Sequence, residues 1–137
     1  MANALYPTAK QAFGQGLIVW KASGGSTIKG ILVDTGTYTY SSAHQYRSSL
    51  SGTVGSAFTL TLIDCDATGA FDAADITDSS VTGVSAEAIV LYKDTGNSAT
   101  DILIAYIDSA TGLPVTPNGG DIVIQWDNGS SKIFRWV

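Results

Sequence analysis

Residues 86–107, AEAIVLYKDTGNSATDILIAYI, contain the pattern that decides the fold. Ala86–Tyr92 has three large aliphatic residues in succession, which predicts a central strand buried on both faces. Asp94–Ser98 is a run of turn-forming polar residues and predicts a hairpin loop. Ile102–Ile107 is apolar again and is expected to pair back on the first strand. The stretch therefore predicts an antiparallel hairpin inside a β-rich domain.

Shorter patterns of the same kind extend outward from this hairpin. Phe58–Leu62 alternates strictly between apolar and polar residues, which is typical of a strand with one buried face. Asp64–Ser80 and Thr111–Gly120 are predicted to be loops, the second because its two prolines cannot donate ladder hydrogen bonds. Further strands are predicted over Leu17–Trp20, Thr27–Val33, Asp121–Trp126 and Lys132–Val137. About seven or eight short strands with frequent turns predict a mainly β domain, an antiparallel β-sandwich or barrel-like fold.

One or two short helices are predicted in the N-terminal half. Residues 6–15 begin with Pro7, which suits the first helical position, and carry apolar residues at roughly helical spacing. The alternative for residues 1–6 is an extended N-terminal arm that contacts a neighbouring molecule. Ser41–Leu50 could form a second short helix capped by a serine.

Size and charge restrict the classes of function. The chain has 137 residues and no linker, which predicts a single domain over residues 1–137. Charged residues make up 14%, below the usual share of about 25%, so much of the polar surface is uncharged and easily desolvated. The net charge of −5 disfavours nucleic acid and anionic membranes as partners. No signal-peptide pattern or long apolar run is present, so synthesis in the cytoplasm is expected.

A calcium-loop pattern runs from Asp64 to Asp75. Asp64, Asp66, Gly69 and Asp72 match positions 1, 3, 6 and 9 of an EF-hand loop; Thr68 stands at position 5 and Asp75 at position 12. The candidate calcium ligands are Asp64, Asp66, Thr68, Asp72 and Asp75. The flanks predict a strand where an EF-hand has a helix, and aspartate reaches less far than the usual glutamate at position 12. A solvated acidic loop is therefore the favoured interpretation.

No residue has the partners that catalysis requires. His44 is the sole histidine and has serines nearby, but no Gly-x-Ser-x-Gly motif accompanies it. Cys65 is the sole cysteine, so it has no disulfide partner in the chain, and it lies between two aspartates that oppose thiolate formation. One cysteine and one histidine also make a poor zinc site. We expect no enzymatic activity and no cofactor.

The aromatic residues are candidates for protein contacts. Trp and Tyr are favoured anchors of interfaces because they bury a large area and keep a polar tip. The interface candidates are Tyr6, Trp20 and Trp136, whereas Trp126, at the end of a predicted strand, is expected in the core.

Several segments resemble a family of small virion proteins of tailed bacteriophages. They are Ser85–Thr100, Leu103–Gly120, Asp121–Val123, Trp126–Gly129, Met1–Pro7, Lys29–Thr35 and Ser41–His44, which together touch most of the chain. The Asp64–Gly69 segment departs from the family's pattern, so the resemblance does not extend to calcium binding.

The resemblance implies a structural protein of the virus particle. Its first implication is a capsid decoration (cement) protein, which would bind the outer surface of the major capsid protein lattice as a homo-oligomer, a trimer or hexamer. It would be made in the bacterial host and located on the virion. Edge strands over Leu17–Trp20 or Lys132–Val137 could extend a neighbour's sheet. The alternative is a tail, neck or head-fibre module that contacts other virion proteins or a host glycan, and a virion-borne glycan hydrolase is a remote third.

Overall fold

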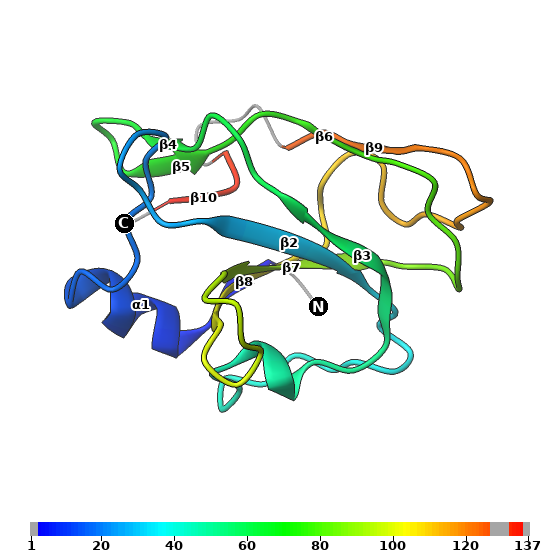
Figure 1. The fold of residues 1–137 in the computed structure, drawn as a ribbon, viewed down its shortest axis with the longest axis horizontal. Coiled ribbons are helices and arrows are strands. Elements are labelled where there is room, and N and C mark those ends of the chain that lie inside the picture. The colour runs from blue at the N-terminus through cyan, green and yellow to red at the C-terminus, as the bar shows by residue number, and fades with distance from the viewer. Residues whose placement is uncertain (1–2, 127–131, 136–137) are drawn as a thin grey trace.

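Ten short strands and two helical segments make up the computed structural model, which describes residues 3–126 and 132–135 (Figure 1). The elements are β1 (Ala4–Leu5), α1 (Pro7–Gly14), β2 (Ile28–Val33), the 3₁₀-helix η1 (Arg47–Ser49), β3 (Thr53–Thr59), β4 (Asp64–Cys65), β5 (Ala70–Asp72), β6 (Ile76–Asp78), β7 (Ala88–Lys93), β8 (Ile102–Ile107), β9 (Ile122–Ile124) and β10 (Phe134–Arg135). The fold is mainly β and antiparallel, as the sequence predicts.

The main layer is a five-stranded sheet in the order β1-β8-β7-β2-β3, with every neighbouring pair antiparallel. Strand β7 lies at its centre, and its first five residues are buried. The loop after β7 returns the chain as β8, which pairs along its length with β7. The hairpin predicted over residues 86–107 is therefore confirmed.

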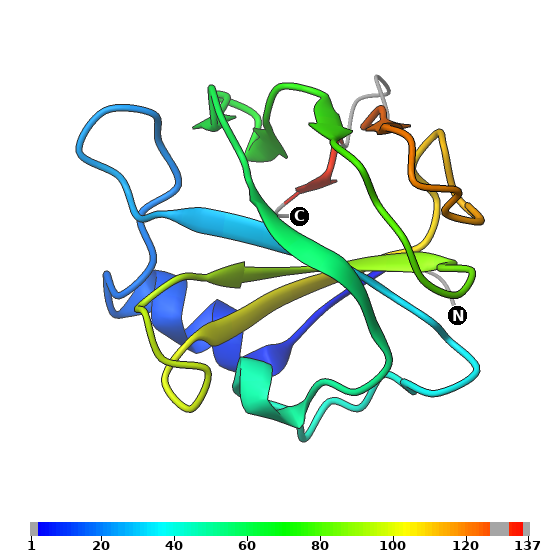
Figure 2. The same ribbon diagram turned by 45° about the vertical axis from the view of Figure 1, so that its right-hand side comes forward.

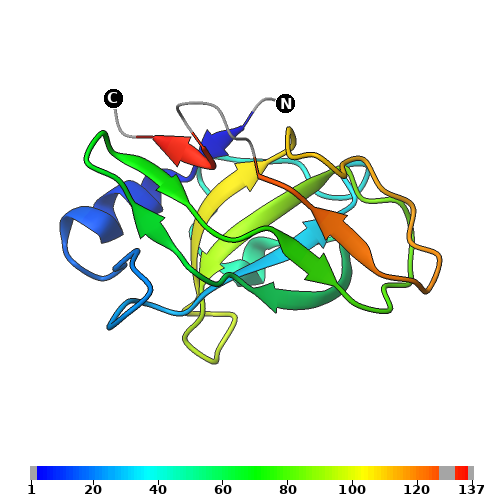
Figure 3. The same ribbon diagram turned by 90° about the horizontal axis from the view of Figure 1, so that it is seen from above.

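The second layer consists of two small sheets that cover one face of the main sheet, as in a sandwich (Figures 1 and 3). One has the order β10-β5-β4, and the other is the pair β6-β9. Their apolar residues pack with those of the main sheet into one core that includes Ile28, Leu32, Ile89, Leu91, Ile104, Phe71, Ile76, Ile124 and Trp126. Helix α1 closes one end of this core with Ala9 and Ala12.

The opposite face of the main sheet is covered by the segment between β2 and β3, residues 34–52 (Figure 2). A second cluster, rich in tyrosine, fills the space beneath it: Tyr6, Ile31, Val33, Tyr38, Ala88, Val90, Tyr92, Leu103 and Tyr106. Alternate residues of β2 and β7 enter the two clusters, as the two-residue period of a strand requires. Both faces of the central strands are therefore buried.

Close packing explains one glycine in the middle of β2. A Cβ atom on Gly30 would lie 2.6 Å from Cε1 of Phe58 on the neighbouring strand. Gly30 and Phe58 are opposite each other in the β2–β3 ladder. The ring of Phe58 therefore packs directly over the Gly30 backbone, and a larger residue has no room there.

At the N-terminus, α1 confirms the helix predicted over residues 6–15, with Pro7 in its first turn. The alternative prediction of an extended arm over residues 1–6 is wrong for residues 3–6, the part that the structure describes. Ala4 and Leu5 pair with Tyr106 and Ala105 of β8, and Tyr6 is fully buried. The reason is a partner strand about a hundred residues away, which no local pattern reveals.

Several predicted boundaries also differ from the structure. Leu17–Trp20 is not a strand, although Ile18 and Trp20 are buried; it belongs to a loop closed by Val19 and Ser26. The predicted loop over residues 64–80 contains β4, β5 and β6. Strand β4 pairs with the neighbouring β5, whereas β5 and β6 are held by long-range pairing with β10 and β9. The strand expected at Phe58–Leu62 begins at Thr53 and ends at Thr59.

Other expectations near the middle and end of the chain hold in part. Within Ser41–Leu50 the only helical turn is η1. The strands predicted over 121–126 and 132–137 are the shorter β9 and β10, and residues 127–131 and 136–137 lie outside the described part. Residues 111–120 form no strand, as predicted. Across the described ranges, no helix combines the length and apolar character needed to cross a membrane.

Candidate interaction surface

The predicted calcium loop is a β-hairpin. Asp64 on β4 and Asp72 on β5 stand opposite each other, and the turn between the strands holds Asp66 and Thr68. One oxygen of Asp66 accepts hydrogen bonds from the Thr68 amide (2.8 Å), the Thr68 hydroxyl (2.6 Å) and the Ala70 amide (3.2 Å). These bonds, that of the Thr68 hydroxyl foremost, lower the pKa of the Asp66 carboxyl below its ordinary value. Asp66 therefore organises the turn.

Asp75, the last residue of the calcium pattern, also forms a structural hydrogen bond. Asp75 accepts a hydrogen bond of 3.1 Å from the amide of Trp126, which fixes the end of β9. Within residues 3–126 and 132–135, no three His, Cys, Asp or Glu side chains are grouped as metal ligands would be. The EF-hand spacing places these residues along a hairpin and not around a common centre.

His44 takes part in a chain of hydrogen bonds with two buried tyrosines. Its Nδ1 lies 2.9 Å from the hydroxyl of Tyr38, which in turn lies 2.7 Å from the hydroxyl of Tyr6. Burial, followed by the contact with Tyr38, raises the pKa of Tyr6. Burial also raises the pKa of Tyr38. This arrangement ties the 34–52 segment to the N-terminus and contains no serine or carboxylate that would form a triad.

Cys65 lies partly buried on β4 and has no disulfide partner. Its pKa is raised, first by burial and then by the carboxylates of Asp66 and Asp64. A raised pKa keeps the thiol protonated at neutral pH, which makes it a weak nucleophile.

Two of the three predicted interface aromatics are core residues. Tyr6 is fully buried, and Trp20 is 6% exposed, donates Nε1–H to the carbonyl of Asp72 (3.0 Å) and packs edge-on against Phe71 and Phe134. Neither ring is available to a partner, so these two assignments are corrected. Trp136 lies outside the described residues. Trp126 is buried, as predicted, and donates Nε1–H to the Ala74 carbonyl.

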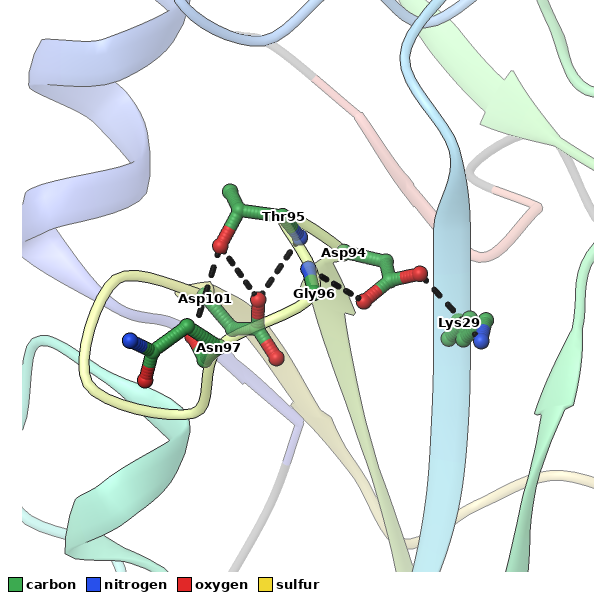
Figure 4. Close-up of polar contacts among 6 residues, drawn as sticks. All are labelled: Lys29, Asp94, Thr95, Gly96, Asn97 and Asp101. Atoms are coloured by element: carbon green, nitrogen blue, oxygen red, sulfur yellow. Dashed lines mark hydrogen bonds and ion pairs between the residues drawn. The ribbon is translucent and has the colours of Figure 1, made fainter.

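The clearest candidate surface is the loop between β7 and β8, residues 94–101 (Figure 4). Residues 95–100 are all exposed, whereas Asp101 at the loop's base is only 2% exposed. The Asp101 carboxylate accepts hydrogen bonds from the amide (2.6 Å) and the hydroxyl (2.7 Å) of Thr95, which closes the loop. Asp94 accepts a bond from the Gly96 amide and forms an ion pair of 3.2 Å with Lys29 on β2.

Further bonds fix the tip of this loop and its neighbours. Asn97 accepts hydrogen bonds from the amides of Ala99, Thr100 and Asp101. The carbonyls of Ser98 and Asp101 accept bonds from the amides of Ser48 and Arg47 in η1. The loop and the 3₁₀-helix therefore form one braced unit, which we call the 94–101 platform.

The 94–101 platform combines exposure with internal order. An exposed loop normally loses conformational freedom when a partner binds, and this loss weakens the complex. The bonds around Asp101 and Asn97 fix the loop in advance, so less entropy is lost. The sequence predicts the loop itself, but the role of Asp101 was missed; an aspartate directly before a buried strand, six residues after a threonine, is the local signal.

One edge of the main sheet is a second open surface. Strand β3 pairs with β2, and no other strand in the described ranges pairs with it. It contains no lysine or proline that would discourage pairing, although the ladder is irregular between Gly30 and Leu32. An extended segment of another protein could add to this edge.

Comparisons with known proteins leave the family open. No model of a known protein family matches the sequence, and a search of curated proteins finds none that is similar.

Proposed function

We propose that this chain is a structural protein of a bacteriophage particle, and that it acts as a decoration protein on the outer surface of the capsid. It would bind the major capsid protein lattice as a homo-oligomer and stabilise the head. The proposal rests on the resemblance of several segments to small virion proteins of tailed phages.

The observation that carries the proposal is the 94–101 platform. Residues 94–100 of the loop fall within one of the segments that resemble the virion family, and residues 95–100 are exposed and held by internal hydrogen bonds. A permanent contact in a lattice benefits from a surface that is ordered before binding. The tip is also uncharged between Thr95 and Thr100, so little electrostatic desolvation opposes contact with a protein surface.

The copy number of the chain in purified particles tests the function. A decoration protein is expected at a molar ratio to the major capsid protein on the order of one copy per lattice subunit or per few subunits, measurable by gel densitometry. A few copies per particle would overturn this role and favour the tail, neck or head-fibre alternative.

Two variants in which an exposed alanine is replaced by tryptophan test whether the 94–101 platform contacts the capsid. Ala99 and Ala22 are both exposed, but Ala99 lies at the tip of the platform and Ala22 lies in the loop before β2. Ala99→Trp places a bulky ring against the partner and should weaken binding to particles stripped of the chain by about tenfold or more. Ala22→Trp is the matched control and should bind as the parent does. Equal binding by Ala99→Trp would exclude the platform while leaving the copy-number test intact.

A further inference from the structure

A groove lies where the two layers of the sandwich meet, between β1 and β10. Strands β1 and β10 lie near each other at one side of the molecule (Figure 3). The groove has a volume of about 340 Å³. Its apolar wall is formed by Leu5, Ala105 and Ile107 from the main sheet and by Ile133 and Phe134 from the other layer.

Three cationic side chains line the same groove. Lys10 comes from α1, Lys132 lies two residues before β10, and Arg135 belongs to β10. The chain contains seven lysines and arginines against twelve acidic residues, yet the described lining of the groove contains no acid. Positive charge is therefore concentrated at one place on an acidic protein.

None of these cations forms an ion pair with another described residue, although Arg135 interacts electrostatically with the nearby carboxylate of Asp66. Only Lys29 and Asp94 form an ion pair among the described residues, and they lie elsewhere. Arg135 donates Nε–H to the carbonyl of Thr68 (3.2 Å), which orients the guanidinium and uses one of its five donors.

An acidic hollow adjoins the groove on the other side of Lys132. It is lined by Asp64, Asp66 and Asp72 of the β4–β5 hairpin together with Lys132. An extended polyanion that entered the groove would meet these carboxylates, whereas a ligand with a single negative charge would not. The neighbourhood therefore selects against polyanions.

We infer that this groove binds a small organic carboxylate with an apolar tail. The carboxylate would lie among Lys10, Lys132 and Arg135, and the tail would lie against Ile107, Ile133 and Phe134. A hollow that combines an apolar wall with a few polar groups is the usual form of a small-molecule site, and the volume of this groove lies at the lower end of the range of ligand pockets. This inference does not depend on the proposed role in the capsid.

Three small probes separate the contributions of charge and tail. Octanoate carries both, acetate carries the charge alone, and 1-octanol carries the tail alone. We expect octanoate to cause saturable amide shifts at Ala105, Ile107, Ile133 and Phe134 in NMR spectra of the full chain. Acetate should cause no saturable shift, and 1-octanol should bind at least about fivefold more weakly, the equivalent of one ion pair.

Charge variants test the assigned residues. Lys10 is exposed and Lys132 is partly exposed, and neither side chain has a hydrogen-bond or ion-pair partner in the described part. The double variant Lys10→Gln/Lys132→Gln should therefore preserve the fold. This double variant should weaken octanoate binding by about fivefold or more. Lys21→Gln, an exposed lysine outside the groove, is the matched control and should leave affinity unchanged. Equal affinity for octanoate and 1-octanol, shifts confined to other regions, or full binding by the double variant would overturn the inference.

Discussion

The hydroxyl oxygens of Tyr6 and Tyr38 lie 2.7 Å apart in the tyrosine cluster, and both rings are almost fully buried. Tyr38 has a second partner, Nδ1 of His44, at 2.9 Å. The two tyrosines are thus unequal: the hydroxyl of Tyr6 has one partner in the described structure, and that of Tyr38 has two.

This inequality predicts different costs for two similar variants. Tyr6→Phe removes one hydrogen bond and leaves Tyr38 paired with His44, so it should reduce the free energy of unfolding by about 1 kcal/mol. Tyr38→Phe leaves the buried hydroxyl of Tyr6 without a partner and should cost about 1–3 kcal/mol. Urea unfolding of both variants provides the measurement. A larger loss for Tyr6→Phe would contradict the arrangement.

The same pair predicts how stability changes at alkaline pH. Burial raises the pKa of both Tyr6 and Tyr38 in the folded protein, whereas an unfolded tyrosine ionises near its ordinary pKa of about 10. The folded state therefore binds more protons, and the free energy of unfolding should fall as pH rises above about 10. Urea unfolding between pH 8 and 11 measures this fall, and absorbance at 295 nm follows ionisation. The Tyr6→Phe/Tyr38→Phe variant should show a shallower fall; an identical slope would count against these two groups as the cause.

Gly30 offers a test of core packing. Gly30→Ala forces the ring of Phe58 or the β2 backbone to move and should destabilise the protein by about 1–3 kcal/mol. Gly14→Ala is the control, because a Cβ at Gly14 meets nothing within 4 Å and alanine favours the helix. Chemical denaturation should give a lower free energy of unfolding than that of the parent for Gly30→Ala and a higher one for Gly14→Ala. Phe58→Leu in the Gly30→Ala background should recover part of the lost stability. If the losses of stability caused by the two substitutions simply add, the contact between position 30 and the Phe58 ring is contradicted.

Asp101 is predicted to control the order of the 94–101 platform. Asp101→Ala leaves the Thr95 amide and hydroxyl without their acceptor and should reduce stability by about 1–3 kcal/mol. Hydrogen exchange at the amides of residues 95–100 should accelerate more than exchange in β7 and β8. Asn97→Ala is a milder comparison, because it removes one side-chain acceptor at the tip. Unchanged exchange at Thr95 in Asp101→Ala would contradict the proposed closure of the loop.

The sequence predicts those parts of the fold that depend on neighbouring residues. The hairpin of β7 and β8 follows from two apolar runs and a polar turn, and α1 follows from Pro7 and helical spacing. Strands β1, β4 and β10 have two residues each, too few for any periodic pattern. Strands β1 and β10 exist because of distant partners, whereas β4 pairs with the nearby β5.

The candidate sites fail or succeed for the same physical reason. The spacing of Asp64 to Asp75 suits an EF-hand only if the chain curls around an ion, and the pairing of β4 with β5 extends it instead. Trp20 lies in a segment predicted to be an edge strand, and Tyr6 lies at the start of a predicted helix or arm, but non-local packing buries both side chains. The 94–101 loop was predictable because its turn residues act within a few positions of one another, whereas the groove between β1 and β10 unites residues from both ends of the chain.

The pairing of β1 with β8 also has a consequence for the order in which the protein forms. Ala4 is paired with Tyr106, so the ribosome must release about a hundred residues before the first strand meets its partner. Until then, α1 and the residues before it lack the surface on which they pack, and local helix formation alone cannot hold an eight-residue segment. Such distant pairing is typical of domains that fold in milliseconds to seconds. Strand β1 is thus synthesised well before its partner and is among the last strands to be paired.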